Sequence, residues 1–428
     1  MPEQTWDDPY DDRSRHRLWR RLSTAVAELD PPPGSPVAVV DLDAFDANAL
    51  DLTARAAGTP VRVASKSLRV RALVERALAT EGFAGVLGYV LVEALHLVAQ
   101  GSCDDVVVAY PTTDRAALGR LLRSPAALAA VTLMVDDPAH LDLVDAVRAA
   151  VPAAERVDAP VRVALDLDAG LHLRGSAGPT VGPRRSPLRT PEAAAALARD
   201  VLERRTAEGR AAYALVGAMT YEGQVAGVPD DVPGQRARSL AVRALKRRSL
   251  DQLADRRRAV AQALADAGAR LEWWNGGGSG SVAESAADPV VTEVAAGSGL
   301  LVPALFDHYR SFRPRPAAYV GVPVTRRPDA RTVTVHGGGL VASGAAGPDR
   351  LPLPWAPPGL RLTGLEGAGE VQTPLVGEPA GWLRIGDLVW LRHAKSGEPF
   401  EHVAVVHLVQ GDRVVATVPT YRGEGLAG

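Results

Sequence analysis

The chain is poor in lysine, in cysteine and in long apolar runs. Of its 428 residues, 48 are lysine or arginine, and only three of these are lysines. The single cysteine, Cys103, rules out an internal disulfide framework and suits the reducing cytoplasm. No apolar stretch approaches the roughly 20 residues that span a bilayer, and the polar N-terminal segment lacks the apolar core of a signal peptide. We therefore expect a soluble cytoplasmic protein without a membrane partner.

The overall charge of the chain is close to neutral. The formal net charge is -2 at pH 7, which argues against nucleic acid as a partner. A basic stretch does run through residues 234–268, but no aromatic residues alternate with its arginines, as an RNA-binding surface would require. We interpret it as the solvated face of a helix, in which Lys246 needs no special role.

Lysine scarcity makes Lys66 informative. A composition in which arginine has replaced nearly every lysine should spare the lysines whose chemistry arginine cannot perform, chiefly loss of the proton and attack on a carbonyl to form an imine. Lys66 directly follows the short run Val61–Ser65, which is typical of a buried strand. Barrel enzymes carry their chemistry at such strand ends. Lys66 is therefore a candidate Schiff-base lysine, with an ordinary surface lysine as the alternative.

Short apolar runs alternate with helical stretches in the first 300 residues or so, which is typical of a parallel α/β fold. The strand-like runs are Val61–Lys66, Gly85–Tyr89, Asp105–Tyr110, Val131–Val135, Val161–Asp168, Leu215–Tyr221, Leu271–Asn275 and Val290–Val294. Eight strands with helices between them match a (β/α)8 barrel better than an open doubly wound sheet.

After residue 310 the pattern changes to β-rich segments separated by glycine and proline. Strands are predicted over 318–325, 332–335, 387–392, 402–409 and 414–418, and the proline-rich segment 344–359 is predicted as a surface loop. Val37–Asp43 is an additional strand that could join this second sheet. The expected organisation is a polar leader (1–35), a barrel (36–305) and a β-rich C-terminal domain (306–428).

A glycine-rich stretch, Asn275–Ser281, follows the seventh predicted strand, and a second small polar loop, 296–299, follows the eighth. In barrels these are the two loops that usually bind phosphate through backbone N–H groups. Gly278–Ala283 also fits a dinucleotide-binding pattern, but it lies late in the chain without the ribose-binding acid of that motif. A plain flexible turn is the other alternative.

A lysine after strand one and a phosphate loop after strands seven and eight define a ligand with a carbonyl at one end and a phosphate at the other, which describes pyridoxal 5′-phosphate. At this point the chain resembles the fold-type III pyridoxal-phosphate enzymes, an alanine-racemase-like barrel followed by a β domain. Within them it is similar to the D-threonine aldolase and D-serine dehydratase branch, including actinobacterial proteins described as amino acid deaminase/aldolase. The resemblance covers roughly residues 35–425. The segments that carry it are 64–67, 85–89 with 93–94, 221–224, 276–281, 292–293 with 297–298, and 393–395.

The resemblance implies roles for particular residues. Lys66 would form the imine with the cofactor and act as a base, and Tyr221 would lie beside the cofactor ring. An arginine after strand five would approach the cofactor's phenolic oxygen; Arg185 and Arg174 compete for this role, and Arg185 is preferred. The phosphate contacts would come from Gly277, Gly278, Ser279, Gly297 and Ser298.

The metal question rests on His393-Ala394-Lys395. The resemblance implies a histidine and, two residues later, a cysteine or aspartate that hold a divalent ion, but here the second position is Lys395, whose charge repels a cation. We hypothesise that the Lys395 ammonium replaces the metal or serves as a second acid or base, and that His393 contributes to catalysis. A rearranged metal site is the alternative; its candidate ligands are His393, Glu398, Glu401 and His402.

The function expected from these features is that of a pyridoxal-phosphate lyase acting on a small-molecule substrate, a β-hydroxy D-amino acid, by retro-aldol cleavage or by dehydration and deamination. An amino acid racemase, a non-catalytic cofactor-binding protein and a barrel aldolase that forms its imine directly with the substrate are the alternatives. The resemblance also implies a homodimer.

Overall fold

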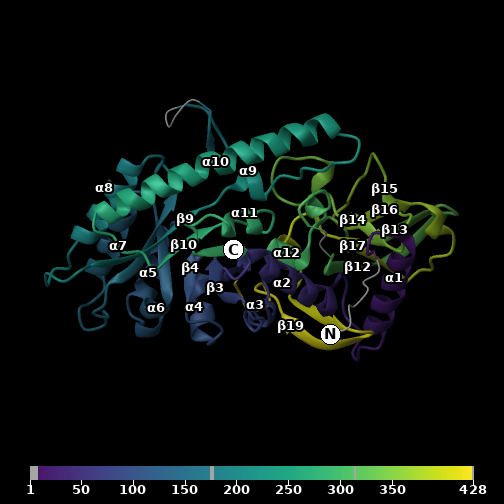
Figure 1. The fold of residues 1–428 in the computed structure, drawn as a ribbon. Helices are drawn as coiled ribbons and strands as arrows, with labels where there is room; N and C mark the ends of the chain where they lie inside the picture. The colour runs from purple at the N-terminus through teal and green to yellow at the C-terminus, as the bar shows by residue number, and fades with distance from the viewer. Residues whose placement is uncertain (1–7, 174–177, 313–314, 427–428) are drawn as a thin grey trace.

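The structure is a computed structural model that describes residues 8–173, 178–312 and 315–426. A closed barrel wrapped by helices occupies one end of the molecule, and a β-rich part occupies the other (Figure 1). The expected (β/α)8 barrel followed by a β domain is thus confirmed.

The barrel closes through parallel strands in the order β10-β11-β2-β3-β4-β5-β6-β9. They are β2 (Val61–Ala64), β3 (Phe83–Gly88), β4 (Val106–Val108), β5 (Val131–Val135), β6 (Val161–Leu167), β9 (Tyr213–Thr220), β10 (Trp273–Gly276) and β11 (Glu293–Ala296). Each was expected, although β11 begins at Glu293 rather than Val290. Pairing with β2 sets this register, because Val294 pairs with Val61 and the Glu293 carboxylate lies 2.7 Å from the Arg62 guanidinium.

Helices surround the barrel, and several begin at a side chain that accepts a hydrogen bond from the first turn. Asp114, Asp137 and Thr190 serve in this way for α5 (Arg115–Leu121), α7 (Pro138–Ala150) and α8 (Pro191–Glu203), and a proline opens the last two of these helices. The barrel-side helices are α2 (Leu42–Ala56), α3 (Arg71–Leu78), α4 (Leu91–Ala99), α5 (Arg115–Leu121), α6 (Pro125–Ala130), α7 (Pro138–Ala150), α8 (Pro191–Glu203), α9 (Gly223–Ala226), α10 (Arg236–Asp266), α11 (Val282–Ala286) and α12 (Ser298–Leu301).

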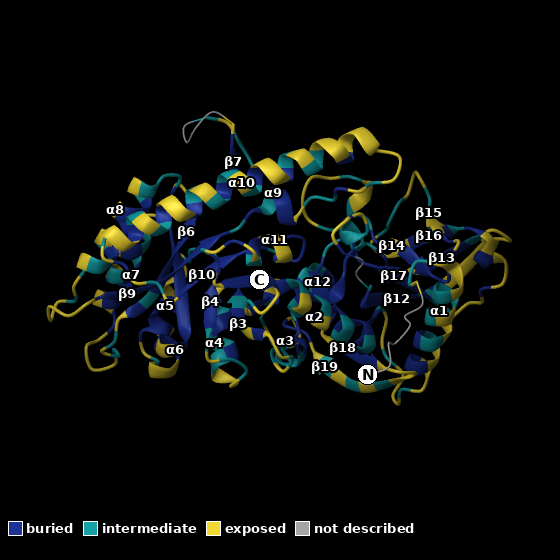
Figure 2. Ribbon diagram, viewed as in Figure 1, coloured by how far each residue is buried: buried dark blue, intermediate teal, exposed yellow. Residues whose placement is uncertain are grey.

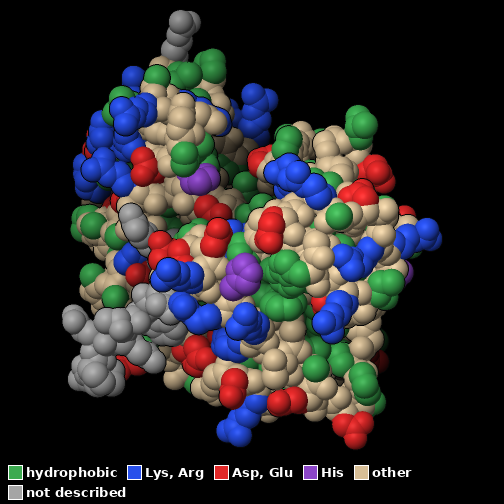
Figure 3. All heavy atoms as spheres, turned by 90° about the vertical axis from the view of Figure 1, so that its right-hand side faces the viewer, with side chains coloured by type: hydrophobic (Ala, Val, Ile, Leu, Met, Phe, Trp, Pro, Cys, Tyr) green, Lys and Arg blue, Asp and Glu red, His purple; other side chains and the backbone are tan. Residues whose placement is uncertain are grey.

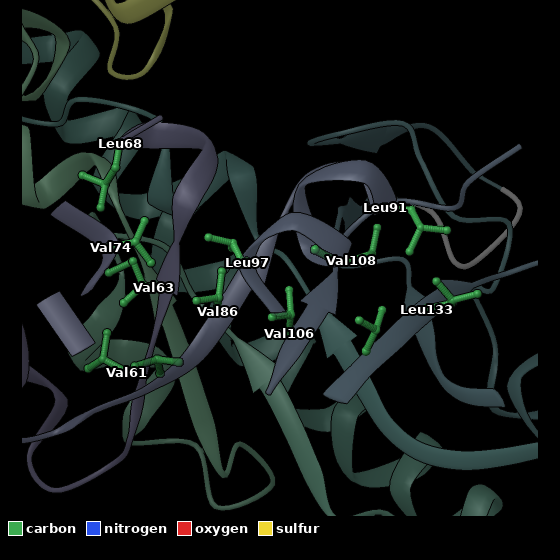
Figure 4. Packing of buried hydrophobic residues seen from close by; sticks show 14 of the residues in the cluster. Val61, Val63, Leu68, Val74, Val86, Leu91, Leu97, Val106, Val108 and Leu133 are labelled. Carbon is green, nitrogen blue, oxygen red and sulfur yellow. The ribbon is translucent and has the colours of Figure 1, made fainter. Parts of the chain in front are cut away.

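The main hydrophobic core lies between the strands and their helices. Figure 4 shows valines of β2, β3 and β4 facing leucines and valines of α3 and α4, with Val63, Val86 and Val106 fully buried. The barrel strands are mostly buried, whereas the helices expose their outer faces (Figure 2). Burial of this apolar surface drives the assembly and leaves the strand ends available for chemistry.

The β domain is a nine-stranded sheet. Its strands are β1 (Val37–Asp41), β12 (Ala318–Asp329), β13 (Thr332–His336), β14 (Leu353–Ala356), β15 (Arg361–Leu362), β16 (Gln372–Val376), β17 (Leu388–Arg392), β18 (Val405–Gln410) and β19 (Arg413–Pro419). The early strand β1 joins this sheet between β12 and β18, as expected.

The prediction of an unbroken loop over 344–359 is wrong. Leu353–Ala356 forms β14, which pairs with β17 alone. Proline at 354 is tolerated because β14 lies at an edge of the sheet, where one side of the strand needs no backbone donor.

The N-terminal segment is more structured than a polar leader. Residues Asp12–Ala27 form helix α1, whose Leu22 is fully buried. The Trp19 indole donates to the Leu388 carbonyl at 2.8 Å, and Ser23 accepts from the Trp390 indole at 3.1 Å. This helix therefore packs on the β domain.

The basic stretch forms the single long helix α10, which runs along the top of the molecule in Figure 1. Its interpretation as a wholly solvated face is wrong for two residues, since Lys246 and Arg257 are buried and paired with carboxylates. No helix within the described ranges combines the length and apolar character needed to cross a membrane. The end of the molecule formed by the β domain carries intermixed acidic and basic side chains (Figure 3).

Candidate active site

A cavity of about 420 Å³ lies where the carboxyl ends of the barrel strands meet loops of the β domain. Most of the residues predicted from the sequence line it together: Lys66, Arg185, Tyr221, Gly277, Gly278, Ser279, Gly297, Ser298 and Lys395. His393, Glu398, Glu401 and His402 do not line it. Arg174 lies outside the described residues.

Lys66 stands in a short 3-10 turn, η1 (Ser65–Ser67), directly after β2. Its Nζ donates to the Tyr110 hydroxyl at 2.9 Å. Burial acts to raise the pKa of Tyr110, but the charges of Lys66 and Arg185 outweigh it and the pKa is lowered. The lysine amine therefore has one defined polar partner in the cavity.

Tyr110 was missed by the sequence reasoning, although it ends the predicted strand 105–110. The rule that singled out Lys66, a polar residue at the end of a barrel strand, would have found it.

Arg185 lies between two aromatic rings. Its guanidinium carbon is 5.4 Å from the centre of the Tyr110 ring and 5.1 Å from that of Tyr221. Burial raises the pKa of Tyr221, with Arg185 opposing the shift. These three side chains place a cation and two phenols in the same cavity as Lys66.

Asp166, near the end of β6, is also close to this cation. Burial and the carboxylate of Asp136 raise the pKa of Asp166 to about 7, while Arg185 lowers it. The aspartate is only 6% exposed and does not line the cavity, so its influence on the cavity is electrostatic.

The two glycine-containing loops are joined by hydrogen bonds and leave no room for a side chain at Gly278 or Gly297. The Ser279 hydroxyl accepts from the backbone N–H groups of Gly297 and Gly299 at 3.3 and 2.9 Å. A Cβ added at Gly278 would lie 2.9 Å from the Cβ of Ala226, and one at Gly297 would lie 2.3 Å from the Ala64 carbonyl. Glycine is required at both positions because neighbouring atoms approach too closely for any other residue.

Glu222 organises the first of these loops from behind. It is fully buried and accepts from the Arg257 guanidinium, the Gly277 N–H and the hydroxyls of Ser281 and Ser285. Glu222 belongs to the quoted segment 221–224, yet sequence reasoning gave a role only to its neighbour Tyr221. Its partners lie 35 or more residues away in the chain, so no local signal marks them.

The opposite wall comes from the β domain. Lys395 Nζ donates to the Ser343 hydroxyl at 2.5 Å and to the Glu398 carboxylate at 2.9 Å. Ser343 also donates to Glu398, through its hydroxyl and through its backbone N–H. An added Cβ at Gly397 would lie 2.1 Å from the Lys66 carbonyl, so this wall rests directly on the Lys66 turn.

His393 lies behind this wall. It is 3% exposed, and its Nε2 is 3.0 Å from the hydroxyl of Ser396, which does line the cavity. Burial, aided by the charge of Arg392, lowers the pKa of His393 to about 3. The ring is therefore neutral and reaches the cavity only through Ser396, which does not support a direct catalytic contact.

The candidate ligands of the rearranged metal site do not lie together in the structure. Glu398 pairs with Lys395, and Glu401 pairs with Arg69 at 2.5 Å. His402 is exposed, and His393 is buried elsewhere. In the described part of the chain, no three histidine, cysteine, aspartate or glutamate side chains gather as a metal site would require.

Lys246 has a place near the cavity that the sequence did not indicate. Its Nζ is 3.1 Å from the Asp230 carboxylate and 4.8 Å from the centre of the Tyr309 ring, which lines the cavity. Burial lowers the pKa of Lys246, with Asp230 opposing the shift.

Comparison with known proteins gives similarity of structure but not of sequence. No protein-family model matches the chain, and no curated protein matches it. Among solved structures, D-threonine aldolase from Filomicrobium marinum is similar with a TM-score of 0.70 and 22% identity over 91% of this chain and 95% of that one.

Two further solved structures extend this likeness. D-threo-3-hydroxyaspartate dehydratase from Delftia sp. HT23 has a TM-score of 0.66 and 20% identity over 91% of this chain and 97% of that one. An alanine racemase from Clostridium difficile 630 has a TM-score of 0.60 and 12% identity over 90% and 99%. The chain therefore has the fold of the alanine-racemase-like proteins, a barrel followed by a β domain, as the resemblance implied.

Proposed function

We propose that this protein is a pyridoxal-phosphate-dependent lyase that acts on β-hydroxy D-amino acids. The observation that carries the proposal is one cavity that holds both the Lys66 amine and the paired loops of Gly277–Ser279 and Gly297–Ser298. The names of the similar aldolase and dehydratase structures support a lyase of this kind.

The residues present fit that cofactor. Ser279 and Ser298 line the cavity, and their backbone N–H groups have no protein acceptor within the described part of the chain. Such donors suit a phosphate group, and the close packing at Gly278 and Gly297 lets the backbone itself form the cradle. The Arg185 guanidinium suits an anionic oxygen on the cofactor.

When bound, pyridoxal phosphate supplies an aldehyde for a lysine amine and an electron sink for the bonds of the substrate's Cα atom. Lys66 provides the amine at the cavity wall and can hold or return a proton at Nζ. Tyr110 fixes that Nζ through its hydrogen bond. Tyr221 and Arg185 orient the ligand from one side, and the β-domain loops limit access of water from the other.

We further propose that the protein works in the cytoplasm as a homodimer and takes a free amino acid rather than a macromolecule. The measurement for the dimer is the molar mass by light scattering during gel filtration. A mass of twice the 44.9 kDa chain is expected.

The test of the proposal is the near-visible absorption of the protein after incubation with pyridoxal phosphate and gel filtration. Wild type should retain a yellow chromophore and consume D-threonine or D-serine with formation of a carbonyl product. Lys66→Ala should lose both the yellow band and turnover, and Lys66→Arg, which keeps the charge without a reactive amine, should behave in the same way.

Two results would overturn the proposal. A wild-type protein that stays colourless with added cofactor contradicts the cofactor assignment. A yellow protein that erases the optical rotation of its substrate without a carbonyl product is a racemase instead.

A further inference from the structure

The β-domain wall of the cavity carries three side chains joined into one array: Ser343, Lys395 and Glu398. Lys395 and Ser343 line the cavity, whereas Glu398 lies behind them. Lys395 Nζ is 2.5 Å from the Ser343 hydroxyl and 2.9 Å from Glu398 Oε1. The Lys395 side chain remains 43% exposed, so it can reach a ligand.

The hydrogen-bond directions show what the array can give. The Ser343 hydroxyl donates to Glu398 Oε1, and the Ser343 backbone N–H donates to Oε2 at 2.8 Å. The hydroxyl proton is therefore committed to Glu398, and the oxygen's lone pairs are left to accept from Lys395. An ammonium has three N–H donors and no acceptor, so one donor remains beyond those used by Ser343 and Glu398.

The charge state follows from the same contacts. Partial burial acts to raise the pKa of Glu398, but the donors of Ser343 and the charge of Lys395 lower it. The ionised carboxylate pairs with the Lys395 amine at 2.9 Å. The other cation on this wall is Arg350, whose guanidinium is 3.7 Å from Asp349. The cavity therefore meets the Lys395 amine as an N–H donor here, while the Glu398 carboxylate lies behind it and already accepts three hydrogen bonds.

We propose that Lys395 is the catalytic acid that protonates the departing β-hydroxyl of the substrate, with Ser343 and Glu398 as its positioning residues, and that the reaction is dehydration and deamination. This inference rests on the proposed function and selects between the two reactions that it leaves open.

The step balances without a redox partner. Lys66 Nζ takes the proton from Cα, and the electron pair of that bond forms the Cα–Cβ double bond. The Cβ–O bond breaks with its pair on oxygen, which takes a proton from Lys395 Nζ and leaves as water. The proton on Lys66 restores the charge of Lys395 through solvent. One water then hydrolyses the released enamine, after its tautomerisation to an imine, to a 2-oxo acid and ammonia.

Retro-aldol cleavage requires a proton acceptor, and not a proton donor, beside the β-hydroxyl. It breaks the Cα–Cβ bond while the hydroxyl loses its proton to a base, so the group facing the hydroxyl must be an acceptor. Lys395 as an ammonium cannot accept a proton, and the Glu398 carboxylate lies behind Lys395 and Ser343 and is held by donors from both.

D-Threonine tests the inference because one substrate reports both reactions. Dehydration yields 2-oxobutanoate and ammonia, and retro-aldol cleavage yields glycine and acetaldehyde. We expect the cofactor-loaded wild type to form 2-oxobutanoate in excess. Lys395→Met should lose about 100-fold or more of that rate, as expected for a missing general acid, while keeping the cofactor band and the exchange of the Cα hydrogen in D₂O.

Two matched variants distinguish a chemical role of Lys395 from a merely structural one. Lys395→Arg keeps a donor and a charge but holds its proton permanently, so it should bind substrate as wild type does without restoring turnover. Glu398→Gln keeps the shape and should move the pH dependence of dehydration to lower pH, because the ammonium loses its ionic partner.

A second readout needs no activity. Because the chain has only three lysines, acetylation of each can be followed against pH by peptide mass spectrometry. On the unloaded protein, Lys395 should react at lower pH in Glu398→Gln than in wild type. An unchanged profile would show that Glu398 does not hold the ammonium and would overturn the inference.

The outcomes separate this inference from the proposed function. Glycine and acetaldehyde from a yellow protein contradict the inference alone, whereas Cα exchange with neither product contradicts both the inference and the proposed lyase function. A protein without the yellow band, or one that is yellow but shows neither exchange nor product, contradicts the proposed function.

Discussion

The two walls of the cavity differ in burial and in chemistry. The barrel wall is built on backbone and on a fully buried carboxylate, Glu222, whose partners fix the glycine loop. The β-domain wall ends in Lys395, whose side chain is 43% exposed. Holding a cofactor requires donors that are already in place, whereas proton transfer to a changing substrate requires an accessible group. This difference supports the proposed roles of the barrel wall in holding the cofactor and of the β-domain wall in facing the substrate.

In the barrel wall, substitution of Glu222 should cause the largest loss of stability. Glu222→Gln removes the charge that faces the buried Arg257 guanidinium at 3.2 Å, and loss of one partner of a buried pair costs about 3 kcal/mol. We expect a lower thermal unfolding midpoint and weaker cofactor binding. Glu366→Gln, at an exposed position, is the control. Equal midpoints for the two variants would show that Glu222 does not organise the loop.

Asp166 should give the barrel a pH dependence. Its pKa is about 7 when folded, against an ordinary value of 3.8 when unfolded. Between these values the folded chain holds the extra proton, so stability falls as the pH rises, by about 2 kcal/mol between pH 5 and 8. Asp166→Asn removes this loss. Its unfolding midpoint should exceed that of wild type at pH 8, and the gain should disappear near pH 4; a constant difference would refute the assignment.

His393 should give the β domain the opposite pH dependence, with stability that falls as the pH decreases. Its pKa is about 3 when folded and 6.5 when unfolded, so the unfolded chain binds the extra proton between these values. Stability is complete above pH 6.5 and falls as the pH decreases, by about 2 kcal/mol at pH 5. The stability difference between wild type and His393→Asn should narrow from pH 7 to pH 5. A difference that widens would mean that His393 is protonated in the folded protein.

Substitution of Gly278, in the barrel wall, should have a smaller effect, which concerns cofactor binding. Gly278→Ala places a methyl group 2.9 Å from the Ala226 Cβ and 3.2 Å from the Tyr221 ring, so the loop must shift. We expect pyridoxal phosphate to bind about tenfold more weakly, which corresponds to about 1.4 kcal/mol. Gly364→Ala, where nothing lies within 4 Å, should bind it as wild type does. Equal affinities would remove this loop from the cofactor site.

The barrel could be predicted from the sequence because each strand is a local apolar run bounded by turn residues. The β domain was predicted less completely. Leu353–Ala356 contains a proline and reads as a loop, and only its edge position permits a strand there. The start of β11 was misplaced because register depends on pairing between strands distant in sequence.

Some residues of the candidate site could also be predicted from the sequence, whereas their contacts could not. Lys66 was predictable because it follows a strand, the glycine loops because of their composition, and Tyr221 only through the family resemblance. The contacts that define their surroundings join residues far apart in the chain, as between Lys66 and Tyr110 or Lys395 and Ser343. The burial of Lys246 is likewise a tertiary effect that its basic sequence context conceals.

We propose that the cofactor binds to the amine of Lys66 and not to that of Lys395. This assignment is tested most directly by borohydride reduction of the cofactor-loaded protein, followed by peptide mass spectrometry of all three lysines. The account predicts a stable adduct on Lys66, with Lys246 and Lys395 unmodified. An adduct on Lys395, or no adduct on any lysine of a yellow protein, would contradict it.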